Sequence, residues 1–504
     1  MNYKINNIKE LIENFEKNKD LLIRENKEKY GQYYSGEKIA RYMASMFKKA
    51  NKNKIRLLDP GCGFGILTAA FLEKILQIED SKVKVVSVTM YEIDNHTIGI
   101  LRNNMNKLCD ECKRRGVKLK YIIKNENFIK GFSNIEDLNS ERYDYVIMNP
   151  PYMKLPVESD DNIILEKLGI KVPNYYAAFI SLAKRLLVKK GELVAITPRS
   201  FCNGAYFLGF RQDLLSDMTF DKIHLFESRT EVFKGDDVLQ ENIIFHCIKK
   251  EAKKNDKINI LHTYGDKFNE LSVSVRRFED IVFPNDNNLI IRILKDNEEK
   301  EITIRINSLT CKLEDLNIQV STGPVVDFRE LKESQSKERI ENSIPFFFSE
   351  HLSTKGITWP KANVKKYNYI RLNEENINRM RLNGNYVLVK RMTSKEEKRR
   401  IVSALCIGNN YDSEFFAFDN KVNYFHRNKQ GLPLNIAKGL VIFLNSTIID
   451  RYFRTFSGNT QVNVTDLKGL NYPTETQLEL LGDRYEEVYQ NQDLIDMTIE
   501  EILF

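Results

Sequence analysis

Residues 57–72, LLDPGCGFGILTAAFL, join the end of an apolar strand to a glycine-rich turn and the first turns of a helix. Asp59 and Pro60 close the strand, and the helix is predicted to begin near Ile66. The turn between them contains Gly61, Gly63 and Gly65. Because glycine has no Cβ, the backbone here can approach a ligand closely. The G-x-G-x-G spacing differs from the G-x-G-x-x-G of dinucleotide sites, so a pyrophosphate is not the obvious ligand.

This stretch is part of a wider alternation of apolar strand-like runs and helical patterns in the first half of the chain. The runs lie at residues 55–59, 83–94, 118–124, 143–149, 191–198, 221–227 and 242–250. Alternation of this kind predicts βαβ units around a largely parallel sheet. We therefore expect an α/β fold with a mostly parallel sheet of seven strands.

Chain length and composition predict two domains. A chain of 504 residues exceeds what one hydrophobic core usually supports. The stretch KKEAKKNDK, residues 249–257, is charged and poor in apolar residues, which favours a linker. Beyond it the pattern is irregular, with short strand-like runs and one long helical segment near residues 435–454. The predicted domains are residues 1–257 and a mixed α/β domain at residues 258–504.

Charge and cysteine content indicate a cytoplasmic protein. Residues 1–20 are charged throughout and lack the apolar core of a signal peptide, and no apolar run approaches the length of a membrane span. The seven scattered cysteines do not form a disulfide framework, which suits a reducing compartment. The net charge of +7 is compatible with a polyanionic partner without requiring one.

An acidic residue stands at the end of the second strand-like run. In MYEIDN, residues 90–95, Glu92 lies where an acid can accept both hydroxyls of a ribose. A solvated charge at a strand end is the alternative. Taken with the glycine turn one strand away, Glu92 favours a cofactor that carries a nucleoside.

A rigid polar turn follows the fourth run. In YDYVIMNPPYMKL, residues 143–155, the apolar strand leads into Asn149, Pro150, Pro151 and Tyr152. Two consecutive prolines fix φ and remove two backbone donors, so the flanking Asn149 and Tyr152 are held in one geometry. An ordinary strand-ending turn is the alternative interpretation of a Pro-Pro pair taken alone.

Three motifs together resemble a known family. LLDPGCGFG, YEID and VIMNPPY resemble motifs I, II and IV of the S-adenosylmethionine-dependent amino-methyltransferases. Their order, with residues 31–43 before them and a large C-terminal region after them, is similar to the γ class of DNA N6-adenine methyltransferases, the class of the TaqI, PstI, BsuBI and XhoI modification enzymes. The resemblance covers about residues 30–250, and residues 320–329 and 456–473 resemble target-recognition segments. It implies a Rossmann-like methyltransferase fold followed by a DNA target-recognition domain.

The resemblance implies a site for S-adenosyl-L-methionine. Asn127 stands where the family has an acid that bonds the adenine amine of the cofactor, and the Asn127 side-chain oxygen can still accept that bond. Phe179 is expected to line the adenine pocket, with core packing as the alternative. The cofactor-binding residues implied are Tyr34, Ser35, Asp59, Pro60, Gly61, Gly63, Glu92, Asn127, Phe128, Asn149 and Phe179.

The polar turn suits the methylation of an exocyclic amine, which is a poor nucleophile because its lone pair is delocalised into the ring. The Asn149 side-chain oxygen and the Pro150 carbonyl are expected to accept the two amine hydrogens and to aim the lone pair, while Pro151 helps to keep both acceptors fixed. A base in a duplex must flip out to reach this turn. Tyr152 and, by resemblance, Phe233 are expected to stack on its two faces, with core packing as the alternative for Phe233.

The C-terminal half is expected to supply sequence recognition. Basic and aromatic residues interleave over residues 361–400, which suits phosphate contacts, although a solvated charged face is the alternative. The polar string at residues 457–466 contains side chains that can bond base edges or cap turns. The predicted DNA-binding residues are Lys365, Lys366, Arg391, Gln461 and Asn463.

The function implied is site-specific methylation of adenine N6 in double-stranded DNA, as the modification part of a restriction–modification system. A separate cognate restriction endonuclease is the further partner, and we expect a monomer without a metal site. Cytosine N4 is the competing acceptor. A protein-glutamine or ribosomal-RNA methyltransferase and a non-catalytic DNA-binding module are rival functions, and transfer of a labelled methyl group to DNA, RNA or protein distinguishes them.

Overall fold

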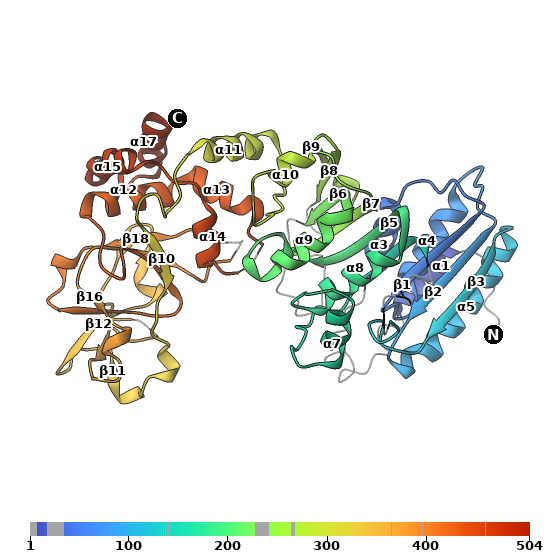
Figure 1. Ribbon diagram of the computed structural model, residues 1–504, viewed down its shortest axis with the longest axis horizontal. Helices are drawn as coiled ribbons and strands as arrows, with labels where there is room; N and C mark the ends of the chain where they lie inside the picture. The colour runs from blue at the N-terminus through green and yellow to red at the C-terminus, as the bar shows by residue number, and fades with distance from the viewer. Residues whose placement is uncertain are drawn as a thin grey trace. The chain divides into compact units, whose positions relative to one another are not determined.

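The computed structural model describes residues 8–17, 35–226, 241–263 and 268–504, apart from positions 133, 135, 137, 139–141, 364, 395, 396 and 459. The chain divides into two compact units, Met1–Lys295 and Asp296–Phe504. Figure 1 traces the first unit in blue to green and the second in yellow to red.

The first unit is built on one large sheet. Within the described residues its strands are β1 (Lys54–Pro60), β2 (Val85–Tyr91), β3 (Lys118–Lys124), β4 (Tyr143–Met148), β5 (Leu187–Pro198), β6 (Met218–Phe226), β7 (Asn242–Lys249), β8 (Lys257–Thr263) and β9 (Ser272–Arg277). They lie in the order β3-β2-β1-β4-β5-β7-β6-β8-β9. The five strands from β3 to β5 are parallel to one another, and β7 runs antiparallel between β5 and β6. The prediction of a mostly parallel sheet is therefore confirmed.

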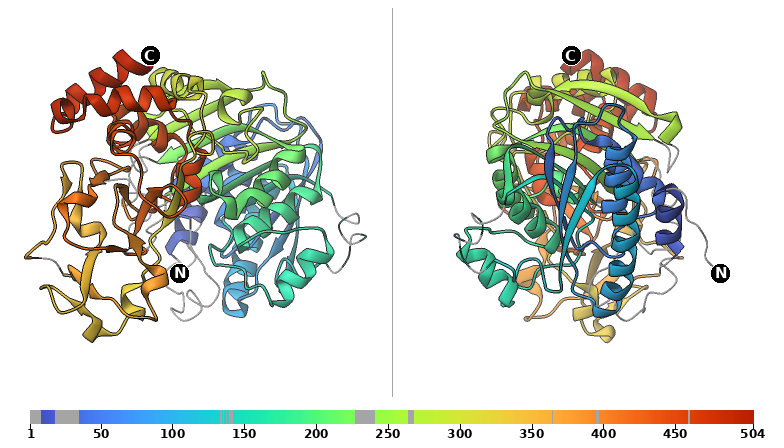
Figure 2. Two further views of the ribbon diagram at one scale, coloured as in Figure 1. Left: turned by 60° about the vertical axis from the view of Figure 1, so that its left-hand side comes forward. Right: turned by 90° about the vertical axis from the view of Figure 1, so that its right-hand side faces the viewer.

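Helices cover both faces of this sheet (Figure 2). They are α1 (Ile8–Lys17), α3 (Glu37–Met46), α4 (Ile66–Gln77), α5 (Asn95–Arg114), α7 (Asp160–Lys167), α8 (Tyr175–Leu186), α9 (Leu208–Asp217) and α10 (Phe278–Ile281). One core joins the sheet to α1, α3, α4 and α5, and the other joins it to α8 and α9. Adjacent residues of a strand pack into the cores on opposite faces of the sheet, as Val146 and Ile147 of β4 do. Burial on both faces explains why the parallel strands are continuous apolar runs in the sequence.

The structure corrects the predicted strand number and the predicted domain boundary. The described part of the sheet has nine strands rather than seven, because β8 pairs parallel to β6 and β9 pairs antiparallel to β8. The unit boundary consequently lies after Lys295 and not after residue 257. The charged stretch that suggested a linker is a connection between β7 and β8, held by an ion pair of 2.9 Å between Lys250 and Asp256.

The second unit combines small sheets with helices. Its strands are β10 (Gln319–Thr322), β11 (Gln335–Ser336), β12 (Ser343–Phe347), β13 (Leu352–Ser353), β14 (Gly356–Ile357), β15 (Tyr369–Arg371), β16 (Arg381–Leu382), β17 (Tyr386–Lys390), β18 (Ser403–Cys406), β19 (Phe415–Phe418) and β20 (Val422–His426). Its helices are α11 (Asn297–Ser308), α12 (Leu434–Asn445), α13 (Thr447–Phe456), α14 (Val464–Gly469), α15 (Glu475–Asp483), α16 (Tyr485–Val488) and α17 (Gln492–Leu503). The expected mixed α/β character is confirmed.

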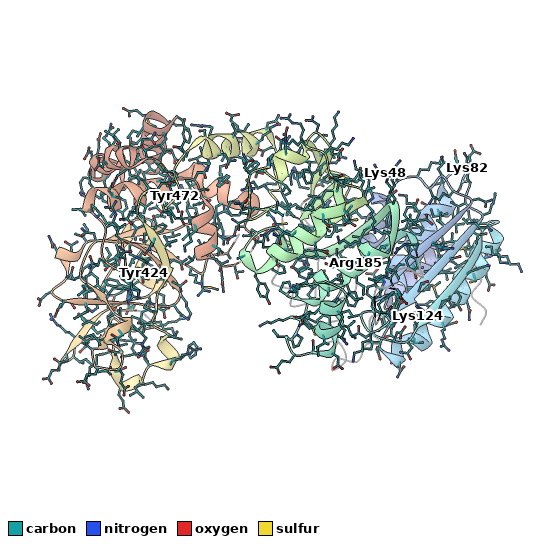
Figure 3. The ribbon with its side chains drawn as sticks, viewed as in Figure 1. Lys48, Lys82, Lys124, Arg185, Tyr424 and Tyr472 are labelled. Atoms are coloured by element: carbon teal, nitrogen blue, oxygen red, sulfur yellow. The ribbon has the colours of Figure 1, made fainter. Side chains whose placement is uncertain are left out.

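Buried polar contacts hold the second unit together. Tyr424 and Tyr472, labelled in Figure 3, are almost fully buried. The Tyr424 hydroxyl accepts a hydrogen bond of 2.7 Å from Arg381 Nε, and the Tyr472 hydroxyl donates one of 2.8 Å to the Leu467 carbonyl. The long helix predicted near residues 435–454 is two helices, because the Ser446 side chain accepts from the Ile449 backbone N–H and so begins α13.

Candidate active site

The carboxyl ends of three neighbouring strands bring the main predicted residues together. In the register of β1 and β2, Asp59 pairs with Met90 and Pro60 with Tyr91, so Glu92 lies just beyond the end of β1. On the other side of β1, Leu58 pairs with Val146, which places Asn149 at the same edge. The chain leaves β1 toward β2 on one side and reaches β4 on the other. Such a point in the strand order is where open α/β sheets bind ligands.

The glycine turn wraps closely around the end of β2. Gly61, Gly63 and Gly65 have φ of +75°, +54° and +84°. The N–H groups of Gly61 and Cys62 both donate to the Tyr91 carbonyl, at 2.9 and 3.0 Å. A Cβ on Gly65 would lie 2.9 Å from Leu101 Cδ1, so both conformation and space require glycine there. The turn thus keeps the backbone close to the strand end before α4 begins.

Glu92 braces the turn from the second strand. Its two carboxylate oxygens accept the backbone N–H groups of Gly63 and Asp94, each at 2.9 Å. The side chain is buried, and burial raises the pKa of Glu92 above its ordinary value. Each oxygen has a second lone pair, so these bonds leave acceptor capacity for the hydroxyls of a ligand. Asp94 is engaged differently, because it caps α5 by accepting from His96 N–H and the Thr97 hydroxyl.

Asp59 offers a second acceptor at the same place. The residue is fully buried, and its Oδ2 accepts the Thr68 hydroxyl at 2.6 Å. Its Oδ1 is buried and makes no hydrogen bond within the part of the chain that the structure describes. Burial raises the pKa of Asp59 from 3.8 to about 7. An unsatisfied carboxylate oxygen beside a tight glycine turn fits a cofactor that carries hydrogen-bond donors.

This raised pKa predicts a pH-dependent cost of burying Asp59. In the unfolded chain the carboxyl ionises near its ordinary pKa, whereas in the fold it keeps its proton up to about pH 7, so stability is lost as the pH rises between the two values. Asp59→Asn removes the ionisation. In the absence of cofactor, we expect this variant to melt at a higher temperature than the wild type at a pH of about 8, with the gain vanishing near a pH of about 4. An equal gain at both pH values, by scanning fluorimetry, would contradict the shift.

The polar turn after β4 holds the Asn149 amide from both sides. Asn149 Nδ2 donates to Ser35 Oγ at 3.2 Å, and the Tyr152 hydroxyl donates to Asn149 Oδ1 at 3.0 Å. The Tyr152 hydroxyl also lies 3.4 Å from the Ile196 carbonyl of β5. Pro150 is buried at the end of the strand. Ser35, which is 114 residues from Asn149 in the sequence, therefore joins Asn149 and Tyr152 in one hydrogen-bonded group.

An aromatic pair lies beside the glycine turn. The rings of Phe128 and Phe179 are 5.1 Å apart between centroids and inclined at 55°. Phe179 Cε1 is 3.7 Å from the position that a Cβ on Gly61 would take. Phe128 also packs against Tyr91 at 4.9 Å. Both rings belong to the same hydrophobic core, and the Phe179 ring lies against the glycine turn. Their roles at the adenine pocket stay predictions.

Asn127 has a different set of contacts from the one expected. Its Oδ1, the predicted acceptor for the cofactor amine, accepts the Ile129 backbone N–H at 2.9 Å. Its Nδ2 donates at 2.9 Å to Oδ2 of Asp161 in α7. Sequence reasoning missed Asp161. The available signal was an acid in the first turn of a helix, after Ser159 as N-cap, shortly behind the Pro-Pro turn.

Two predicted site residues, Tyr34 and Phe233, lie outside the described residues.

Several predicted DNA contacts in the second unit are engaged within the protein. Lys366 forms an ion pair with buried Asp327. Arg391 donates to the Asn420 carbonyl at 3.0 Å and to Gln461 Oε1 at 3.4 Å. The N–H and Nδ2 of Asn463, at the start of α14, bond to Asp466 Oδ2, so this residue caps a helix. Lys365 is exposed to solvent, as its predicted contact with a DNA phosphate requires. The DNA contacts expected of these residues stay predictions.

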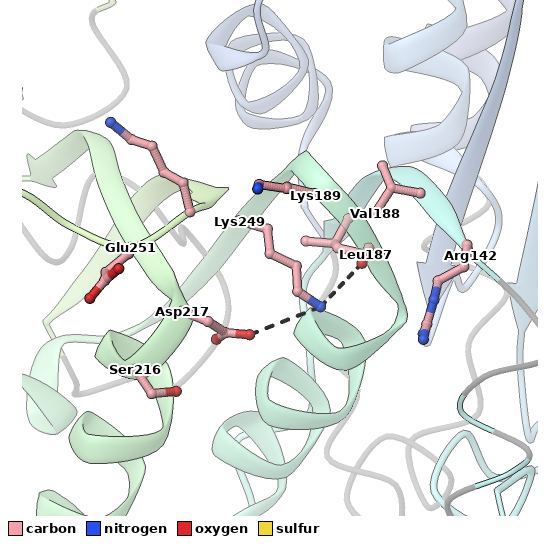
Figure 4. A pocket seen from close by; sticks show the side chains of 9 residues that line it. Arg142, Leu187, Val188, Lys189, Ser216, Asp217, Lys249 and Glu251 are labelled. Carbon is pink, nitrogen blue, oxygen red and sulfur yellow. Dashed lines mark hydrogen bonds and ion pairs between the residues drawn. The ribbon is translucent and has the colours of Figure 1, made fainter.

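A surface cavity of about 780 Å³ lies at the opposite end of the sheet. It is lined by Leu187, the first residue of β5, and by Lys249, the last residue of β7, among others (Figure 4). Lys249 Nζ donates to the Leu187 carbonyl at 3.1 Å and lies 4.0 Å from Asp217. The cavity is therefore separate from the carboxyl-end site, and its central lysine is already paired.

None of the described helices is both long enough and apolar enough to cross a membrane.

Comparison with known proteins identifies relatives over nearly the full chain. The family model described as Eco57I restriction-modification methylase matches residues 66–233. The type II methyltransferase M.PstI of Providencia stuartii is 41% identical over 484 residues, covering 94% of this chain and 93% of that protein. The type II methyltransferase M.BsuBI of Bacillus subtilis is 38% identical over 487 residues, covering 95% of each. A solved DrdV–DNA complex covers 95% of this chain and 59% of that one, at 12% identity and a TM-score of 0.47, too distant to bear on function.

Proposed function

Because the chain belongs to the type II methyltransferases of restriction–modification systems, we propose that it transfers a methyl group from S-adenosyl-L-methionine to N6 of an adenine in duplex DNA, at one short target sequence. The observation that supports this chemistry most strongly is the Asn149 amide, held between Ser35 and Tyr152 at the end of β4. Cytosine N4 would present the same kind of amine to the same group, so it remains the competing acceptor.

The cofactor site is proposed at the ends of β1 and β2. When bound, S-adenosyl-L-methionine supplies an electrophilic methyl group. Glu92 would accept the ribose hydroxyls through its remaining lone pairs, and Asp59 Oδ1 would accept a further donor of the ligand. Phe179 would pack against the adenine ring next to the glycine turn. These residues bind and orient the cofactor, which is the methyl donor. The target amine is bound by residues that follow β4.

Asn149 is proposed to activate the target amine by geometry and not by strong base catalysis. The Tyr152 hydroxyl donates to Asn149 Oδ1, and Nδ2 donates to Ser35, so the amide orientation is fixed before the base arrives. An amide oxygen has two lone pairs, so it can accept an amine hydrogen as well as the tyrosine hydroxyl. The Pro150 carbonyl would accept the other hydrogen. Drawing both hydrogens away from the ring plane directs the nitrogen lone pair outward, toward the methyl group.

The base must leave the duplex to reach this turn. Extrusion costs a few kcal/mol, and stacking on an aromatic ring offsets part of that cost at ~1–3 kcal/mol per base. The half-buried ring of Tyr152 is in place to supply such a face. Target recognition is assigned to the second unit, with exposed Lys365 as a phosphate contact. A separate endonuclease that cuts the same sequence completes the proposed system.

Glu92 gives a direct test of the cofactor site. Glu92→Gln keeps the size of the side chain but replaces one carboxylate oxygen by a donor. We expect it to weaken the binding of S-adenosylhomocysteine, the demethylated cofactor, by about 1–3 kcal/mol, because a ligand hydroxyl then loses its acceptor. Asp110→Asn, on the exposed side of α5, is the matched control and should leave the dissociation constant unchanged. An unchanged constant for Glu92→Gln would place the ribose elsewhere.

The choice of macromolecular substrate is tested by methyl transfer from tritiated cofactor. Duplex DNA, transfer or ribosomal RNA and cell protein are offered in separate reactions, with Asn149→Ala as the inactive control. We expect label in duplex DNA alone. Label in RNA or protein instead would favour the other amine-methylating enzymes that carry this turn, and DNA binding without any transfer would indicate a non-catalytic module.

A further inference from the structure

Asp161 is a buried carboxylate that uses only one of its two oxygens. The residue is 6% exposed and lies in the first turn of α7. Its Oδ2 accepts both Asn127 Nδ2 and the Tyr175 hydroxyl, each at 2.9 Å. Its Oδ1 is buried and has no hydrogen-bond partner among the described residues. Leaving a buried acceptor unsatisfied is costly, so this atom calls for a donor that the protein itself does not supply.

The two donors to Asp161 connect it to the aromatic pair beside the glycine turn. Asn127 directly precedes Phe128, and Tyr175 lies one helical turn before Phe179 in α8, on the same face of that helix. Burial, and then the hydrogen bond to Asp161, raise the pKa of Tyr175 to about 12, so its hydroxyl keeps the proton that it donates. Asp161 is therefore held by the residue that precedes Phe128 and by a tyrosine one helical turn from Phe179, whose ring lies against Gly61.

The donors that a nucleoside cofactor offers can be divided among the acceptors of the site. Glu92 touches the backbone of Gly63 and lies at the end of β2, which suits the ribose hydroxyls. Asp59 lies at the end of β1, under the same turn. The exocyclic amine of the purine ring is the donor that would sit at the aromatic pair. The Asn127 oxygen already accepts one bond, from Ile129 N–H, whereas Asp161 Oδ1 accepts none among the described residues and is the acceptor in greater need of a donor.

Resting on the function proposed above, we infer that Asp161 is a specificity-determining residue of the cofactor site: its Oδ1 accepts a hydrogen bond from the adenine amine, while Asn127 and Tyr175 hold the carboxylate through Oδ2. The segment that follows the Pro-Pro turn thus helps to bind the cofactor as well as flanking the site of the target base.

The inference is tested by calorimetric binding of two ligands to the full-length protein. S-adenosylhomocysteine carries the amine, and S-inosylhomocysteine has a carbonyl oxygen in its place. We expect the wild type to prefer the adenosyl ligand by roughly 10- to 100-fold, since a carbonyl would face a carboxylate oxygen. Asp161→Ala should lose most of this preference. Asp161→Asn should reverse it, because Asn127 and Tyr175 would hold the amide oxygen and leave the amide NH₂ to donate to the carbonyl.

Controls separate this inference from the proposed function. Asp160→Ala changes the neighbouring carboxylate, whose side chain is 79% exposed and pairs with Lys130 at the surface, and it should leave both affinities unchanged. If the folded wild type binds neither ligand, the proposed function fails. If the wild type binds but shows no preference, or if a folded Asp161→Asn keeps the wild-type preference, the role of Asp161 is wrong and the proposed function stands. Should Asp161→Ala not fold, the nearly isosteric Asp161→Asn decides the matter.

Discussion

Asn149→Ala is expected to lower the rate of methyl transfer by roughly 10²–10³-fold or more, comparable to removing one preorganised contact from an oxyanion site. The variant loses the oxygen that accepts an amine hydrogen, and it also releases Ser35 and Tyr152 from the group that they form with the amide. Cofactor affinity should change little, because Asp59, Glu92 and the glycine turn are on other strands. Single-turnover rates on duplex DNA, with S-adenosylhomocysteine affinity measured in parallel, check both statements.

A matched control for this variant is Asn106→Ala. Asn106 is an exposed asparagine on α5, where its side-chain oxygen accepts a surface hydrogen bond from the Tyr121 hydroxyl. The control should retain wild-type rates. If Asn149→Ala also retained near-normal turnover, the amide would not be acting on the target amine. If Asn149→Ala lowered the affinity for the cofactor by as large a factor as the rate of methyl transfer, Asn149 would belong to the cofactor site.

Three substitutions of Tyr152 should separate its ring from its hydroxyl. Tyr152→Phe keeps the stacking face and removes the hydrogen bond to Asn149, so we expect a several-fold loss in rate, in line with about 1 kcal/mol for one hydrogen bond. Tyr152→Ala also removes stacking worth ~1–3 kcal/mol, and its rate should fall further. Tyr152→Lys adds a charge in the base pocket and should be the slowest of the three.

Fluorescence of 2-aminopurine at the target position reports base extrusion independently of chemistry. We expect Tyr152→Phe to extrude the base as the wild type does, and Tyr152→Ala to do so less. Equal losses in Tyr152→Phe and Tyr152→Ala would show that orientation of the amide, and not stacking, is the main role of this residue.

The sequence predicted the first unit well because its signals are local and strong. The apolar runs are continuous where strands are buried on both faces, and the glycine turn and the Pro-Pro turn mark the ends of β1 and β4 directly. The expected relationship to restriction–modification methyltransferases is confirmed by relatives that match almost the whole chain. The two extra strands were missed because β8 and β9 follow a charged connection that resembles a linker.

Contacts between distant residues could not be predicted. Nothing local distinguishes Lys366, paired with Asp327, from a lysine that awaits a phosphate. Asn463 suits either a base edge or a helix cap by its chemistry, and the structure shows it bonded to Asp466 at the start of α14. Asp161 was missed because its importance depends on Asn127 and Tyr175, which only the fold brings to it.

The most direct test of the central claim is the identity of the methylated nucleoside. Duplex genomic DNA is treated with the purified protein and S-adenosyl-L-methionine carrying a deuterated methyl group, then digested and analysed by mass spectrometry, and the modified positions are located by long-read sequencing. We expect deuterated N6-methyldeoxyadenosine confined to one short sequence, and no label with Asn149→Ala. Deuterated N4-methyldeoxycytidine, or methyladenine scattered without a shared sequence, would contradict it.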